Sequence, residues 1–132
     1  MEADELLKAY EANEKEAHAS YGGKRLEVTG KVRGLETGVI GSFDKDAKPD
    51  EITSIAEIIE SSGTPRGTSI VIAMGKGLGV VVLASKTSAA VTGLDRAKLG
   101  DVLTLKGFCV GIPSYARRQS KVRVIITEAG LW

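Results

Sequence analysis

Five short runs with the residue pattern of β-strands constrain the fold of this 132-residue chain more than any other feature. They read RLEVTGKVRG, SIVIAM, GVVVLAS, DVLTLKGFCVG and KVRVIITEAG, beginning at residues 25, 69, 79, 101 and 121. In the first and fourth runs apolar and polar residues alternate, and Gly30 and Gly107 fall on the apolar side. A glycine at an inward position of a strand indicates a bulge or a sharp bend. We therefore expect sharply coiled strands rather than a flat sheet.

The order of these runs indicates how the sheet closes. The second and third runs are joined by GKGLG, whose glycines suit a tight connection, so the two runs are expected to pair as a hairpin. A long segment precedes this hairpin, and KTSAAVTGLDRAKLG, with Leu94, Ala97 and Leu99 at helical spacing, follows it. A small closed Greek-key barrel of the OB type has this order of elements. The predicted fold class is therefore mainly β with helices, a five-stranded OB-fold barrel.

The first 21 residues have the spacing of an amphipathic helix. The residues that share its apolar side step by three or four positions and are Leu6, Tyr10, Asn13, Ala17 and Tyr21. We expect one helix over residues 1–21, ended by Gly22 and Gly23 and packed on the barrel. Asn13 is interpreted as a buried clasp for backbone groups at the Gly30 bend, so Asn13→Asp is expected to destabilise more than Asn13→Ala.

A second helix is expected inside the long segment between the first and second strands, an insertion over about residues 43–67. Pro49 and Asp50 form a good helix start, and the isoleucines that follow are Ile52, Ile55, Ile58 and Ile59. This apolar side is expected to pack on its own barrel, and the alternative is a surface for a protein partner or a second copy of the chain. The length favours a single domain, residues 1–132, with the barrel over residues 24–132.

Two motifs resemble those of a known family. The first spans the helix and the first strand and has Ala9, Tyr10, Asn13, Glu14, Ala17, Tyr21, Gly23, Lys24, Leu26, Val28, Gly30 and Val32 at matching positions. The second is LGDVLTLKGFCVG, matching through Gly100, Asp101, Val102, Lys106, Gly107, Cys109 and Gly111. The chain thus resembles the tRNA_anti-like family of bacterial OB-fold domains. The residues we expect to form its structural motif are Tyr10, Asn13, Glu14, Tyr21, Lys24, Gly30 and Gly107.

The resemblance also carries expectations about function and location. The family takes its name from anticodon-binding OB domains, which implies nucleic acid as a ligand. Many members carry an export signal or a lipoprotein anchor, which implies a protein that is exported or attached to the cell envelope. The acidic start MEADE does not read as a signal segment, and no apolar run approaches the ~18 residues of a membrane span.

A local cluster of positive charge supports nucleic acid, although the formal net charge is only +1. The segment between the fourth and fifth strands contains four cations in seven residues, namely Arg117, Arg118, Lys121 and Arg123, and Tyr115 precedes them. Lys31 and Arg33 of the first strand are expected to extend this patch. Cations that bind phosphates and rings on which bases stack are the requirements for single-stranded DNA or RNA.

The alternative is an exported cell-envelope module that binds a protein, a peptide or a small ligand and has no role with nucleic acid. The hairpin that floors the groove of an OB fold contains no aromatic residue here, which leaves Tyr115 and Phe108 as the stacking candidates. Both alternatives stay open at the level of sequence.

No enzyme activity, cofactor or metal is expected. The only histidine, His18, has no serine or cysteine nucleophile in a recognisable arrangement. The only cysteine, Cys109, excludes an internal disulfide and lies on the inward side of its strand, so it is predicted to be a buried, inert thiol.

Overall fold

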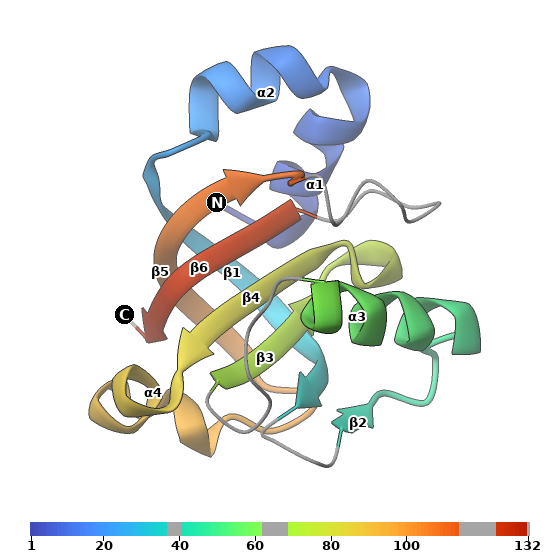
Figure 1. Ribbon diagram of the computed structural model, residues 1–132, viewed down its shortest axis with the longest axis vertical. Helices are drawn as coiled ribbons and strands as arrows, with labels where there is room; N and C mark the ends of the chain where they lie inside the picture. Colours follow the sequence, from blue (N-terminus) through green and yellow to red (C-terminus); the bar gives the residue numbers. More distant parts are fainter. Residues whose placement is uncertain (37–40, 62–68, 114–123, 132) are drawn as a thin grey trace.

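The structure is a computed structural model, and it describes residues 1–36, 41–61, 69–113 and 124–131 (Figure 1). The helices and strands in chain order are α1 (Ala3–Ala12), α2 (Glu14–Tyr21), β1 (Arg25–Glu36), β2 (Gly41–Phe43), α3 (Pro49–Ser61), β3 (Ser69–Met74), η1 (Lys76–Leu78), β4 (Val80–Ser85), α4 (Lys86–Thr92), η2 (Leu94–Arg96), β5 (Val102–Gly111) and β6 (Val124–Leu131).

Five of the strands close into a barrel in the order β1-β3-β4-β6-β5, with β5 returning to pair with β1. The β4–β6 pairing is parallel and the other pairings are antiparallel, so the barrel is mixed. This is the arrangement of an OB fold, and the predicted fold class is confirmed. The short strand β2 lies outside the barrel and extends the sheet at the end of β1. The predicted helical turns after the hairpin are also confirmed, as α4 and η2.

The strand β1 closes the barrel because it pairs with two neighbouring strands. Its first half pairs with β5 and its second half pairs with β3, and the register shifts between Val32 and Gly34. At the inward Gly30, an added Cβ would lie 2.8 Å from the sulfur of Met74 and 3.1 Å from the Cβ of Ala3. Glycine suits this position because β1 lies in close contact with α1 and with the Met74 side chain, which would have to shift to admit a Cβ.

The N-terminal segment forms two helices, so the prediction of a single helix over residues 1–21 is wrong. The chain is extended at Asn13 (φ −160°, ψ 98°), and the Asn13 side chain is exposed and accepts a hydrogen bond of 3.1 Å from the backbone N–H of Glu16. Asn13 is thus the N-cap of α2, and its interpretation as a buried clasp is wrong as well. Its short amide competes for backbone hydrogen bonds, which favours a helix start over a helix interior.

The helix α1 is an integral part of the barrel core. Ala3, Leu6, Leu7 and Tyr10 are buried in the same cluster as the inward side chains of the strands. The helix α2 contributes the buried Ala17 to that cluster, and its half-buried Tyr21 packs against it. The chain then turns at Gly23, whose φ of +72° is in the left-handed region that favours glycine, as the sequence predicts.

The insertion between β1 and β3 forms a second core on the outside of the barrel. Ile55, Ile58 and Ile59 of α3 are buried in one cluster with the outward residues of β3, β4 and β6. The helix begins with a capping interaction, because the Glu51 carboxylate accepts a hydrogen bond of 3.1 Å from the Lys48 N–H. The expectation that this helix packs on its own barrel is confirmed. No helix in the described ranges is both long and apolar enough to span a membrane.

Candidate functional site

The side of an OB fold that commonly binds oligonucleotides is formed by its second and third strands, here β3 and β4. In this protein that side is covered. The outward side chains Val71, Ala73, Val81 and Leu83 are at most 9% exposed, because α3 lies over them (Figure 1). An aromatic residue on this side of the hairpin would therefore be covered and could not stack on a base. Unbroken apolar runs such as SIVIAM are typical of strands buried on both sides, and this signal in the sequence predicts the cover.

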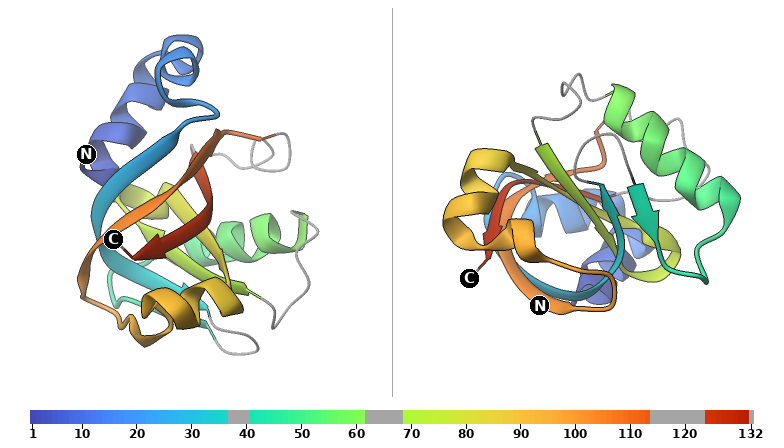
Figure 2. Two further views of the ribbon diagram at one scale, coloured as in Figure 1. Left: turned by 90° about the vertical axis from the view of Figure 1, so that its left-hand side faces the viewer. Right: turned by 90° about the horizontal axis from the view of Figure 1, so that it is seen from below.

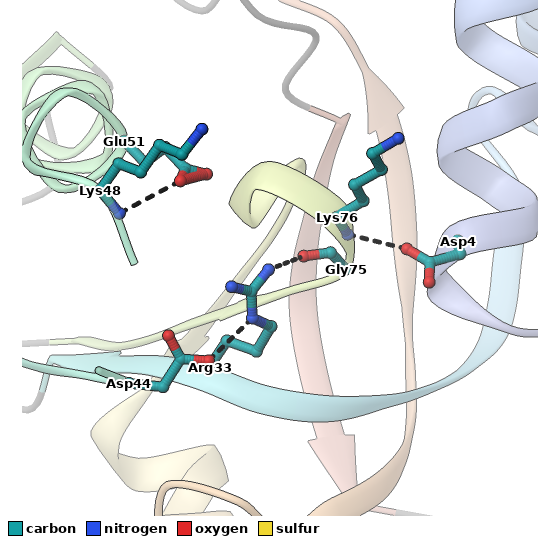
Figure 3. A network of polar contacts seen from close by, with 7 residues as sticks. All are labelled: Asp4, Arg33, Asp44, Lys48, Glu51, Gly75 and Lys76. Atoms are coloured by element: carbon teal, nitrogen blue, oxygen red, sulfur yellow. Dashed lines mark hydrogen bonds and ion pairs between the residues drawn. The ribbon is translucent and has the colours of Figure 1, made fainter. Parts of the chain in front are cut away.

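An ion pair fixes the insertion to the barrel. The Nε of Arg33 in β1 donates to the Oδ2 of Asp44 at 2.8 Å, and its Nη1 donates to the carbonyl oxygen of Gly75 at 2.9 Å (Figure 3). The bond from Arg33 holds the pKa of the Asp44 carboxyl below its usual range, and the same bond raises the pKa of Arg33. Arg33, which the sequence suggests as a phosphate contact, thus already uses two of its donors to join β1, the segment after β2 and the β3–β4 connection.

A cleft of about 400 Å³ lies beside this ion pair, at the rim of the barrel. It is lined by Glu2, Ala3, Asp4, Thr29, Gly30, Lys31, Arg33, Gly75, Lys76 and Val102. We call it the rim cleft. The side chains of Lys31 and Lys76 are exposed, and the Asp4 carboxylate accepts a hydrogen bond of 2.8 Å from the backbone N–H of Lys76 (Figure 3). The rim cleft therefore carries charges of both signs, with three cationic and two acidic side chains in its lining.

The other predicted contacts, Tyr115, Arg117, Arg118, Lys121 and Arg123, lie outside the described residues. The ends of the strands that flank them are described. The strand β5 ends at Gly111 beside the start of β1, where Gly23 N–H donates to the Cys109 carbonyl oxygen at 2.8 Å. At the start of β6, Val124 N–H donates to the carbonyl oxygen of Gly79 at 2.8 Å. Val124, the first described residue after the cationic segment, is therefore bonded to the β3–β4 connection that carries Lys76.

Tyr10, one of the family motif residues, joins three elements of the fold. The hydroxyl of the buried Tyr10 lies 3.4 Å from the Sγ of Cys109 and 3.3 Å from the Nδ1 of His18, which ties α1 to β5 and α2. Burial raises the pKa of both the Tyr10 phenol and the Cys109 thiol. Cys109 is 1% exposed, which confirms the prediction of a buried thiol.

The remaining motif residues vary in burial. Gly107 is buried and pairs with Leu26 of β1. Glu14 and Tyr21 are half-buried, whereas Lys24 is exposed. No group of three or more histidine, cysteine or acidic side chains suited to a metal ion occurs among the residues that the structure describes.

The outer side of the β1–β5 pair brings together residues that the sequence does not place side by side. The guanidinium carbon of Arg25 lies 5.0 Å from the ring centroid of Phe108, its register partner on β5. Phe108 is 38% exposed, and the hydroxyls of Thr29 and Thr104 lie 2.9 Å apart further along the pair. Phe108 is a stacking candidate from the sequence, but its pairing with Arg25 depends on the strand register.

Comparisons with known proteins agree with this fold. A family model described as tRNA_anti-like matches residues 1–121, which confirms the resemblance found in the sequence. No curated protein matches the chain. A crystal structure described as a "putative nucleic acid-binding lipoprotein" from Klebsiella pneumoniae subsp. pneumoniae MGH 78578 is similar, with a TM-score of 0.58 and 13% identity, over 100% of this chain and 91% of that chain. At this identity the similarity shows a shared fold.

Proposed function

Because this chain belongs to the tRNA_anti-like family, we propose that it is a non-catalytic OB-fold module that binds single-stranded nucleic acid at the rim of its barrel. The family is one of binding domains rather than of enzymes. The similar structure from Klebsiella pneumoniae is described as a "putative nucleic acid-binding lipoprotein", which supports the same class of ligand.

The observation that carries the proposal is the presence of exposed cations in the lining of the rim cleft. Lys31 and Lys76 are exposed there. The four cations Arg117, Arg118, Lys121 and Arg123 directly precede Val124, which is bonded to Gly79 three residues after Lys76. Exposed cations at the rim cleft attract a phosphate backbone independently of its sequence, and we expect the four cations of the basic segment to add to this attraction. Tyr115 supplies a ring for stacking.

Two features weaken the attraction between the rim cleft and a phosphate backbone. Glu2 and Asp4 line the same cleft and repel phosphates. Arg33 contributes at most through the donors that Asp44 and Gly75 leave unused. We therefore expect weak affinity with a strong dependence on salt, rather than tight recognition of one sequence.

The test is fluorescence anisotropy with a labelled single-stranded oligonucleotide, measured from ~50 mM salt upward. Each phosphate contact on a single strand contributes roughly 0.7 to the slope of log affinity against log salt. Changing Arg117 and Arg118 together to alanine is expected to flatten the slope by about 1.4. Tyr115→Ala is expected to weaken binding at nearly unchanged slope. Lys86→Ala is the matched control, because Lys86 is an exposed cation at the start of α4, on neither the rim cleft nor the basic segment.

The alternative is a cell-envelope module that binds a protein, a peptide or a small ligand. The observation that favours it is the cover of α3 on β3 and β4, because the usual oligonucleotide groove of an OB fold is closed. Absence of binding to single-stranded DNA and RNA at ~50 mM salt would exclude the nucleic-acid proposal and leave this alternative, since a cationic track has at least weak nonspecific affinity under those conditions.

A further inference from the structure

The outward residues of β1 and β5 form an open surface that we name the β1–β5 face. They are Arg25, Glu27, Thr29 and Lys31 of β1, and Val102, Thr104, Lys106, Phe108 and Val110 of β5. We propose that a single nucleic-acid strand lies along this face, with a base stacked on the Phe108–Arg25 pair and a phosphate bound by Lys31. This inference rests on the proposed function and names the surface that performs it.

The β1–β5 face is open. The alternate residues Val28, Gly30, Leu105 and Cys109 point into the barrel, so the outward set faces away from the core. Val102 is 69% exposed, and Phe108 and Val110 are each 38% exposed. Figure 2 shows β1 and β5 at the front of the left-hand view, with no described helix lying over them. By contrast, the outward side of β3 and β4 is closed by α3.

The Phe108–Arg25 pair has the chemistry of a base-stacking site. Bases in single strands stack on aromatic rings and on guanidinium planes, and here the two lie against each other at 5.0 Å. The contact with the ring also holds the guanidinium, which lowers the conformational entropy that Arg25 would lose on binding.

The charges along the face complement a phosphate backbone. Arg25, Lys31 and Lys106 are cationic, and Glu27 is the one acid among the outward residues of this face. Between the two ends, the Thr29 and Thr104 hydroxyls form a neutral polar pair at 2.9 Å. Arg25 and Lys31 are six residues apart on one strand, which is roughly 20 Å and room for up to about six stacked nucleotides.

The β1–β5 face continues into the rim cleft at one of its ends. Its Phe108 end lies three residues before Gly111, after which the cationic segment follows in the chain. Its other end shares Thr29, Lys31 and Val102 with the rim cleft. A strand on this face can therefore run from Phe108 toward Lys31 and the rim cleft without displacing α3.

The experiment measures oligonucleotide affinity and its salt slope for surface variants of the full chain. Phe108→Leu keeps an apolar side chain and removes the ring, so we expect binding weakened by roughly 5-fold to 150-fold at an unchanged slope. Phe108→Tyr keeps the ring and is expected to bind more tightly than Phe108→Leu. Lys31→Ala is expected to reduce the slope by about 0.7, while Lys86→Ala leaves it unchanged. Glu27→Gln is expected to tighten binding, because it removes the acid from the strand's path.

The outcomes separate this inference from the proposed function. If the wild-type protein binds while Phe108→Leu, Lys31→Ala and Glu27→Gln bind as it does, the β1–β5 face is not the site and the proposed function stands. If the wild-type protein does not bind at ~50 mM salt, both are overturned. Thermal unfolding of each variant is measured in parallel, and the Tyr-against-Leu comparison at Phe108 decides the case if Phe108→Leu is destabilised.

Discussion

The Arg33–Asp44 ion pair is predicted to stabilise the attachment of the insertion to the barrel. The perturbation is a double-mutant cycle of Arg33→Met, Asp44→Asn and the double variant. Exposed ion pairs contribute about 0.2 to 1 kcal/mol, and hydrogen bonds to charged groups contribute about 1.5 to 3 kcal/mol. The Arg33 and Asp44 side chains are 21% and 22% exposed and 2.8 Å apart. We therefore expect a coupling energy between these ranges, roughly 1 to 2 kcal/mol.

The dependence on pH gives this prediction a second test. The pKa of Asp44 is lower in the folded protein than in the unfolded chain because Arg33 donates to the carboxylate. The unfolded chain therefore binds the proton more readily, and the stabilisation is complete above the usual carboxyl pKa of about 4. It is lost as the pH falls through the lower, folded pKa. Arg33 stays protonated throughout this range, so it does not change the sign.

The assay is urea denaturation of the four proteins at pH 7 and again at the lowest pH at which the wild type still folds cooperatively. We expect the coupling energy to decrease in acid and to remain constant between pH 6 and pH 8. A coupling energy below about 0.3 kcal/mol at pH 7 would refute the reasoning, because it would be within the additivity error of independent sites. A coupling energy that does not respond to acid would refute the assigned role of the carboxylate.

Three further predictions follow from the fold. Ile58→Ala is expected to cost about 2 to 5 kcal/mol in denaturation experiments because Ile58 is fully buried between α3 and the barrel, and the half-buried Ile52 is the control, with a smaller loss on Ile52→Ala. Asn13→Ala is expected to cost about 1 kcal/mol of thermal stability through loss of the α2 cap, whereas Asn13→Asp keeps an acceptor at the helix N-terminus and retains more stability than Asn13→Ala; the opposite order would support the buried clasp. Cys109 is expected to react with a thiol reagent only at the rate of unfolding, because burial protects it and raises its pKa, and rapid labelling of the native protein at neutral pH would contradict the structure.

The sequence alone is enough for the barrel and the family. Strand alternation has a period of two residues, and the roles of Gly23 and Gly30 follow from the absence of a Cβ, so both signals are local in the chain. The tRNA_anti-like resemblance uses the same local spacing, from Tyr10 to Val32, and the family match confirms it. The order of the strand-like runs then leaves few ways to close the sheet.

The sequence was less informative where two local patterns compete. Asn13 fits the apolar stripe of one long helix by its spacing, yet the same residue is a strong N-cap, and the hydrogen bond to Glu16 decides between the two. The packing of a helix on the outward side of β3 and β4 could have been predicted from the sequence, because the residues on both sides of these strands are apolar. The cationic residues from Tyr115 to Arg123 lie outside the described residues and remain a prediction.

Only the tertiary structure decided which residues meet at the candidate site. Arg33 is bonded to Asp44 and Gly75, which are 11 and 42 residues away in the chain. Arg25 lies against Phe108, which follows it by 83 residues (108 − 25). Such contacts depend on strand register and on the path of the insertion, and a one-residue change of register would turn every side chain of a strand to the other side. Local sequence patterns determine the elements because the backbone period is local, whereas the pairing of side chains from distant segments is settled only when the core packs.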